Sequence, residues 1–202
     1  MSLLPVAKGA EANLYRENGK LIKERIKKDY RIPELDLRLR RSRTKRESKL
    51  LERARRSGIY TPRIYETDLR NFTIKMEFID GKLLRDLISE IDDSELDKLS
   101  VMIGNEIARM HNSNIIHNDL TTSNMILCND RIYFIDFGLG LTSNRIEEKA
   151  TDLVVLKKSL KAAHTRRFNL IWNSILRGYK NADRNSETIK RINTIEKRAR
   201  YT

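Results

Sequence analysis

The 202-residue chain carries a net charge of +13, with 39% hydrophobic and 34% charged residues. This length suits one domain, or two small lobes around a cleft. Its single cysteine, Cys128, excludes an intrachain disulfide, and no apolar run approaches the roughly 20 residues of a membrane span. The N-terminus lacks the basic start and long apolar core of a signal peptide, so we expect a cytoplasmic protein with no membrane contact.

The first third of the chain predicts an antiparallel sheet. Asn18-Gly19 separates two extended runs, and both residues tolerate positive φ, which favours a hairpin. A basic connection broken by Pro33 follows, and apolar spacing then predicts a helix over residues 44–57 that stops at Gly58. Strands are expected over residues 4–7, 12–16, 20–25, 64–67 and 72–78.

After Gly81 the pattern changes to helices, with a second hairpin expected from residues 125–127 and 132–135. Helices are expected over residues 83–89, 94–112, 146–163, 167–179 and 186–200. A sheet with one helix, followed by helices, predicts an α+β fold with two lobes. We place the N-terminal lobe at residues 1–79 and the C-terminal lobe at residues 80–202.

The most specific motif is H-N-D-L-T-T-S-N, residues 117–124, followed by I-D-F-G, residues 135–138. Phosphoryl transfer needs a carboxylate near the attacking hydroxyl, and oxygen ligands that hold magnesium against the nucleotide phosphates. Asp119 fits the first role, and Asn124 and Asp136 fit the second. Each is an ordinary loop residue by itself, but their order and spacing predict a site for ATP and Mg²⁺.

These motifs resemble the protein kinase superfamily, which implies a minimal bilobal kinase-like fold. Lys23, in L-I-K on the third strand, matches the lysine that contacts the α- and β-phosphates, and Glu47 on the following helix would pair with it. Lys20 and Lys27 compete for the first role, and Glu52 competes for the second. We expect Lys23→Ala to impair nucleotide use more than folding, because an ion pair at a cleft surface contributes only about 0–1 kcal/mol.

The same resemblance implies contacts with adenine and with the phosphates. M-E-F-I-D-G, residues 76–81, looks like the hinge, where backbone groups of Glu77 and Ile79 would bind adenine and Met76 would be the gatekeeper. Backbone N–H groups of the K-G-A-E-A loop would cover the phosphates. The loop residues assigned to ATP binding are Lys8, Gly9, Ala10 and Glu11.

The three histidines are not expected to bind a metal. The kinase histidine at the position of His117 usually orients backbone near the D-F-G turn, which implies a structural role. His111 and His164 lack the company of other metal ligands and are interpreted as ordinary helix residues.

Several motifs differ from those of ordinary protein kinases, and these differences reduce the number of kinase families that the chain can resemble. The phosphate loop has one glycine where ordinary kinases have three. Asn118 replaces the arginine that binds a phosphorylated activation loop, and Thr121 replaces the lysine that helps neutralise the γ-phosphate. Between Gly138 and the helix containing Asp152 there is no room for a full activation segment. These losses argue against efficient phosphorylation of free protein substrates.

Over nearly its whole length the chain resembles the small atypical kinase subunit of the KEOPS (EKC) complex. Asn118 stands where that family usually has glycine. The most specific matches beyond the kinase motifs are K-G-A-E-A (8–12), Y-R-I-P-E-L-D (30–36), R-T-K-R-E (43–47) and K-A-T-D-L-V-V-L (149–156). The resemblance implies an ATPase and Ser/Thr kinase in which Asp119 orients water or a hydroxyl. It also implies a threonylcarbamoyl-transferase partner, a small KEOPS subunit and tRNA, with this chain as a monomer within the hetero-complex.

The excess of positive charge predicts an acidic partner, and its clustering favours nucleic acid. The RNA-binding candidates are Arg38, Arg40, Arg41, Arg43, Lys197, Arg198 and Arg200. Such binding would depend strongly on salt. Alternatively, the run over residues 38–46 packs on the N-terminal lobe and pairs with local acids.

Other functions remain open at this stage. One is a free-standing atypical protein kinase of the ribosome-biogenesis type, and another is a small-molecule phosphotransferase, which the +13 charge disfavours. A third is a binding module with a purely structural nucleotide site. The presence of all five site residues argues against the third, since a degenerate site usually loses one. The five are Lys23, Glu47, Asp119, Asn124 and Asp136.

Overall fold

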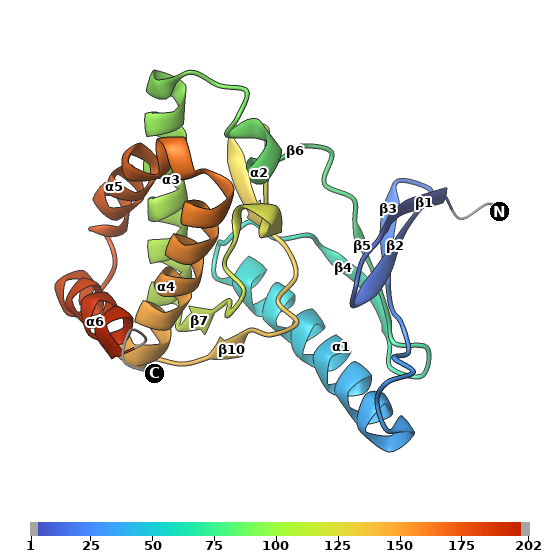
Figure 1. Ribbon diagram of the computed structural model, residues 1–202. Coiled ribbons are helices and arrows are strands. Elements are labelled where there is room, and N and C mark those ends of the chain that lie inside the picture. Colours follow the sequence, from blue (N-terminus) through green and yellow to red (C-terminus); the bar gives the residue numbers. More distant parts are fainter. Residues whose placement is uncertain (1–3, 199–202) are drawn as a thin grey trace.

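A five-stranded antiparallel sheet with the order β1-β2-β3-β5-β4 forms the N-terminal lobe in the computed structural model, which describes residues 4–198 (Figure 1). Its strands are β1 (Leu4–Lys8), β2 (Ala12–Glu17), β3 (Lys20–Arg25), β4 (Ile64–Asp68) and β5 (Thr73–Glu77). Asn18 and Gly19 have φ of 49° and 72°, so the expected hairpin joins β2 to β3. The sheet therefore places β3 between β2 and β5.

The helix α1 (Pro33–Arg56) begins eleven positions before the helix expected from residue 44, so that part of the sequence prediction was wrong. Pro33 does not break this segment. It opens the helix, where its fixed φ is suitable and its missing N–H is not needed. Glu34 and Asp36 in the first turn complement the positive end of the helix. The basic run over residues 38–46 is consequently helical.

The C-terminal lobe is mostly helical, as expected (Figure 1). Its helices are α2 (Leu84–Leu87), α3 (Asp93–Asn112), α4 (Ile146–Ala163), α5 (Phe168–Tyr179) and α6 (Asn185–Arg198), with short 3₁₀ turns at η1 (Thr122–Asn124) and η2 (Thr165–Arg167). Two small sheets pair β6 (Lys82–Leu83), β8 (Met125–Cys128) and β9 (Arg131–Phe134), and β7 (Ile115–Ile116) with β10 (Leu141–Thr142). Within residues 4–198, no helix has the length and apolar character needed to cross a membrane.

One hydrophobic core joins α1 to the C-terminal lobe. Leu50, Leu51 and Ala54 of α1 are buried in the same cluster as the apolar stripe of α3. The N–H of Phe134 on β9 also donates to the carbonyl of Tyr60, at 2.9 Å. The last turns of α1 are therefore held by the lobe that carries the H-N-D and D-F-G motifs. Earlier in α1, the Ser48 hydroxyl lies 2.7 Å from the Thr67 hydroxyl on β4, so the same helix also contacts the sheet (Figure 1).

Candidate nucleotide and phosphoryl-transfer site

Four charged side chains from three segments meet between the lobes. Lys23 Nζ lies 2.7 Å from Glu47 Oε1 and 2.8 Å from Asp136 Oδ1. The guanidinium of Arg25 donates to the other oxygen of Glu47. Only 1% of the Glu47 side chain and 8% of the Lys23 side chain are exposed. The Lys23–Glu47 pair is therefore buried, and our premise of a surface ion pair was wrong.

The alternation of β3 explains this arrangement. Successive side chains on a strand point to opposite faces, so Lys23 and Arg25 share one face. The competing residues lie elsewhere: Lys20 Nζ lies over the Tyr65 ring at 4.8 Å, and Glu52 lies 3.8 Å from Arg56 on α1. Sequence reasoning missed Arg25, although its position two residues after Lys23 is a signal that could have identified it.

Asp136 has a constrained backbone and a strongly stabilised carboxylate. Its φ of 62° is unusual for a residue other than glycine, and such strain is concentrated at functional sites. Burial alone would raise the pKa of Asp136, but Lys23, Arg25 and the Gly138 N–H outweigh it and lower this pKa to about 2. The group is therefore a carboxylate at neutral pH.

The predicted catalytic loop lies beside the D-F-G turn. Asn124 Nδ2 donates to the Asp119 carbonyl at 2.8 Å and to Asp119 Oδ2 at 3.0 Å. The N–H of Ile135 donates to the Asn124 carbonyl at 3.0 Å. His117 Nε2 lies 3.0 Å from the Ile135 carbonyl, which is the backbone contact expected for this histidine. The two motifs are thus joined by direct hydrogen bonds.

Asp152 of α4 holds the backbone of this loop. Its two carboxylate oxygens accept from the N–H groups of His117 and Asn118, each at 2.8 Å. Asn118 has φ of 60°, a conformation that glycine and asparagine adopt most readily. This explains physically how asparagine can stand where glycine is usual. A buried aspartate within an apolar helix face was the available signal for Asp152, and the sequence analysis assigned it no role.

His111 is not the ordinary helix residue that we expected. It is fully buried, with Nε2 at 3.2 Å from Asp152 Oδ2 and Nδ1 at 2.8 Å from the Tyr179 hydroxyl. Burial raises the pKa of Tyr179, so its hydroxyl stays protonated. His164 lies just beyond α4, where its Nε2 is 3.3 Å from the Thr122 hydroxyl and burial lowers its pKa. Neither histidine joins a metal-ligand group among the described residues.

We expect Tyr179→Phe to lower the free energy of unfolding by about 1–2 kcal/mol, because it leaves a buried ring nitrogen of His111 without its partner. Chemical denaturation would measure this change. Tyr133→Phe, on the half-buried face of β9, is the matched control and should be nearly neutral. Equal stability of the Tyr179→Phe variant and the wild type would show that the His111–Tyr179 bond contributes nothing to stability.

The hinge and phosphate-loop residues have contacts of their own. The N–H of Glu77 donates to the Arg63 carbonyl at 2.8 Å, so this N–H is already occupied, and an adenine contact would need the Glu77 carbonyl or Ile79. Met76 is buried on β5. In the phosphate loop, the Gly9 N–H donates to the Ala12 carbonyl at 3.0 Å. The loop is therefore a closed turn beside β1.

Two further loop residues are held by basic side chains. The ammonium of Lys28 donates to the Ala10 carbonyl. Glu11 pairs with Arg43 at 2.7 Å and Arg31 at 3.2 Å. Partial burial would raise the pKa of Glu11, but these arginines lower it. Its carboxylate thus links the loop to α1, and Lys8 at the end of β1 is exposed.

The four arginines of α1 that are RNA-binding candidates divide into two groups. Arg40 Nε lies 2.7 Å from the buried Asp36, and its guanidinium lies 4.2 Å from the centre of the Phe72 ring. Arg40 and Arg43 therefore follow the alternative in which the run pairs with local acids, whereas Arg38 and Arg41 are exposed. Lys197 and Arg198 end α6, also exposed, and Arg200 lies outside the described residues.

The side chains at the D-F-G turn fit a magnesium ion. Lys23 and Gly138 both contact Oδ1 of Asp136, and Oδ2 has no protein partner in the described chain. Because the amide nitrogen of Asn124 faces Asp119, its carbonyl oxygen points away from that residue. One carboxylate and one amide oxygen, completed by phosphates and water, form a donor set that Mg²⁺ commonly uses.

Comparison with known proteins shows which family the chain belongs to. A family model described as the RIO domain matches residues 12–154. The KEOPS complex subunit Bud32 of Pyrococcus abyssi is 39% identical over 97% of this chain and 95% of its own length. The chain belongs to the Bud32 family of RIO domain proteins. This family membership agrees with the resemblance found from the motifs and identifies an atypical kinase family.

Other relatives of this Bud32-family chain are longer proteins. A probable bifunctional tRNA threonylcarbamoyladenosine biosynthesis protein of Methanobrevibacter smithii is 44% identical over 98% of the chain, which spans only 36% of that relative. A relative with the same description in Methanocaldococcus jannaschii is 43% identical, and the chain again spans 36% of it.

Solved structures show the same fold at low identity. The Rio2 kinase of Chaetomium thermophilum, in an ADP/Mg²⁺-phosphoaspartate complex, superposes with a TM-score of 0.60 at 15% identity, covering 97% of this chain and 70% of the other. WaaP, in complex with acyl carrier protein, gives a TM-score of 0.66 at 16% identity, covering 99% and 88%. The Bud32-family chain thus has a protein-kinase-like fold.

Proposed function

We propose that the chain is an ATP- and Mg²⁺-dependent phosphotransferase or ATPase that acts as one subunit of a KEOPS-type complex in the threonylcarbamoyladenosine modification of tRNA. Its partners are a threonylcarbamoyl-transferase subunit, a small KEOPS subunit and tRNA. The chain is a monomer within this cytoplasmic hetero-complex. The lobes divide between residues 79 and 80, where the strands of the large sheet have ended.

The observation that carries this proposal is the direct contact of Lys23 with Glu47 and Asp136, next to the Asp119–Asn124 pair. When bound, Mg²⁺ would neutralise charge on the nucleotide phosphates. Asn124 and Asp136 would hold the metal. Glu47 fixes Lys23, whose ammonium would contact the α- and β-phosphates of a bound nucleotide. Asp119 orients the attacking water or hydroxyl.

The surrounding loops supply the rest of the nucleotide site. Adenine binds at the hinge through the Glu77 carbonyl and Ile79, and the phosphates lie under the backbone of residues 8–11. Between Gly138 and the start of α4 the chain forms only the short strand β10, which pairs with β7. Without a longer segment to dock a peptide, water or a hydroxyl of the chain itself is a better acceptor than a free protein substrate.

The alternative is a free-standing kinase of the ribosome-biogenesis type. It is considered because of the RIO domain match and the likeness to Rio2. The likeness to Rio2, at 15% identity, supports the fold alone. The KEOPS assignment is supported instead by the relative in Pyrococcus abyssi, with 39% identity over nearly the full length of both chains.

The test is ATP hydrolysis by the purified chain with Mg²⁺, measured with and without the transferase partner and tRNA. We expect turnover to rise when both are added, because the proposed function is that of a subunit acting within the complex on tRNA. Turnover that ignores both additions, with phosphate transferred to an unrelated protein, would instead establish a free-standing kinase.

A further inference from the structure

A surface cavity of about 480 Å³ lies between the start of α4 and the length of α6, lined by four arginines, one glutamate and one isoleucine. The lining residues are Arg145, Ile146, Glu147, Arg184, Arg191 and Arg198. None of them belongs to the Lys23–Asp136 cleft. The cavity volume falls within the range of about 300–1,000 Å³ that is common for small-molecule sites.

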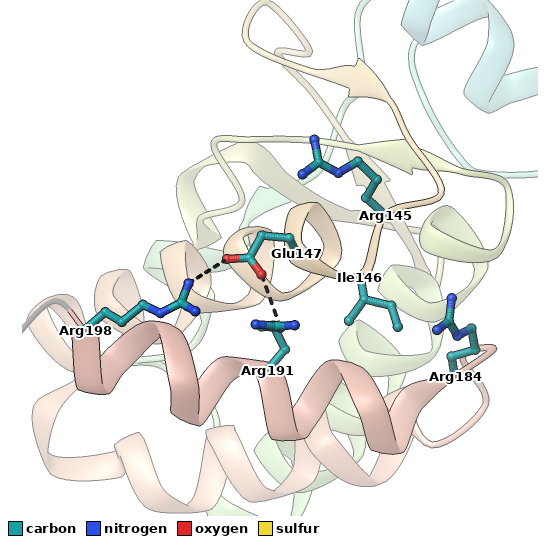
Figure 2. Close-up of a pocket in the computed structure, with 6 residues that line it drawn as sticks. All are labelled: Arg145, Ile146, Glu147, Arg184, Arg191 and Arg198. Carbon is teal, nitrogen blue, oxygen red and sulfur yellow. Dashed lines mark ion pairs between the residues drawn. The ribbon is translucent and has the colours of Figure 1, made fainter.

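The cavity has an excess of positive charge. Figure 2 shows Glu147 pointing from α4 toward α6, where it meets Arg191 at 3.2 Å and Arg198 at 3.9 Å. At the edges, Arg184 pairs with Glu187 at 2.7 Å and Arg145 lies 3.7 Å from Glu148. Within residues 4–198, the four guanidinium groups pair with three carboxylates, of which only Glu147 lines the cavity.

The arginines are accessible to a large partner. Between 40% and 71% of each of the four side chains is exposed. Guanidinium groups present several N–H donors in a planar fork that matches phosphate oxygens. An anion that enters between α4 and α6 would compete with Glu147 for Arg191. Arg145, before α4, and Arg184, at the start of α6, line the same cavity (Figure 2).

We propose that this cavity binds backbone phosphates of RNA. The proposal rests on the proposed function, which makes tRNA a partner, and it assigns the contact to Arg145, Arg184 and Arg191 in addition to the end of α6. A free phosphate or nucleotide has the same chemistry. RNA is favoured because the arginines lie on an exposed surface, in line with Lys197 and Arg198, and because the whole chain carries a charge of +13.

The test measures binding of the full chain to an unmodified tRNA transcript by fluorescence anisotropy over a salt series. The double variant Arg184→Gln/Arg191→Gln should weaken binding on the order of tenfold, and should reduce the slope of log K against log salt by about 1–2. Glu147→Gln should strengthen binding, because it removes the carboxylate that competes with phosphate. Melting temperatures of all variants check that each is folded.

The matched control is Lys161→Gln/Arg166→Gln, which removes the same charge from two exposed residues, one in the last turn of α4 and one in η2. We expect this control to leave the salt slope nearly unchanged. An equal effect of both double variants would show that only bulk charge matters and would overturn the proposal. So would a wild-type chain that fails to bind tRNA at low salt.

Pyrophosphate is used to test whether the cavity binds a free phosphate compound instead of RNA. Its binding to the wild type and to Arg184→Gln/Arg191→Gln is measured by calorimetry. If the double variant loses pyrophosphate binding but keeps its tRNA affinity, the cavity binds a small phosphorylated ligand instead of RNA, and the proposal is overturned. ATP hydrolysis by the wild type is measured in parallel. No turnover even after the transferase partner and tRNA are added would refute the proposed function and leave the RNA-binding result standing, so the two failures are distinguishable.

Discussion

Replacing Asp136 with asparagine is expected to lower Mg²⁺-dependent ATP turnover by about 100- to 1,000-fold, the range for removing one preorganised electrostatic contact from an active site. The substitution removes the charge that would hold the metal, and it removes one of two carboxylates beside Lys23. Asparagine is preferable to alanine, because Asp136 has φ of 62° and asparagine tolerates positive φ. Turnover is measured with the transferase partner and tRNA present.

The matched control for this experiment is Asp130→Asn, in the exposed turn between β8 and β9. Asp130 also has a positive φ, 56°, so the control makes the same chemical change in a similar backbone conformation. It should leave turnover unchanged. Full activity of Asp136→Asn would refute the assignment of Asp136 to the metal and with it the kinase-like mechanism.

Acid should narrow the difference in stability between the wild type and Asp136→Asn. The folded-state pKa of Asp136, about 2, is below the ordinary 3.8, so the charged group stabilises the fold fully above pH 3.8. That contribution is lost as the pH falls through 2. Asparagine does not titrate, so the wild type should lose more stability than the variant between these pH values. Urea unfolding at a series of pH values would measure this.

The sequence was sufficient to predict those parts of the site whose positions depend on residues close together in the chain. The spacing from residue 117 to residue 138 places Asp119, Asn124 and Asp136 around one hairpin, and the turn at Asn18-Gly19 sets the register of β3. Those features follow from turn chemistry and strand alternation, which act over a few residues. The pairing of Lys23 with Glu47 was instead implied by the resemblance to protein kinases, and no local signal in the sequence specifies it.

What the sequence left open depends on contacts between distant elements. Pro33 allows either a break or a helix start, and only packing of α1 against the sheet and the core of the C-terminal lobe decides between them. Asp152 and His111 lie on separate helices, and their shared role requires the packing of α3, α4 and α5. The arginines of the α4–α6 cavity are spread over more than fifty positions, so no local pattern joins them.

Replacing Glu47 with glutamine is expected to lower the free energy of unfolding by about 3 kcal/mol and the melting temperature by roughly 6–12 °C. Only 1% of the Glu47 side chain is exposed, and its two oxygens meet Lys23 and Arg25. Without this carboxylate, two buried cations share Asp136 as their remaining acid. The loss should be at the lower end of the range for a broken buried pair, because Asp136 still faces Lys23.

Glu52→Gln is the matched control, because Glu52 is on the same helix but is about half exposed and pairs only loosely with Arg56, at 3.8 Å. Its effect should be below about 0.5 kcal/mol. Lys23→Ala should destabilise less than Glu47→Gln, since Arg25 remains on Glu47 and the partly exposed Asp136 can be hydrated. Equal melting temperatures of Glu47→Gln and Glu52→Gln would mean that the buried cluster does not hold α1 against β3.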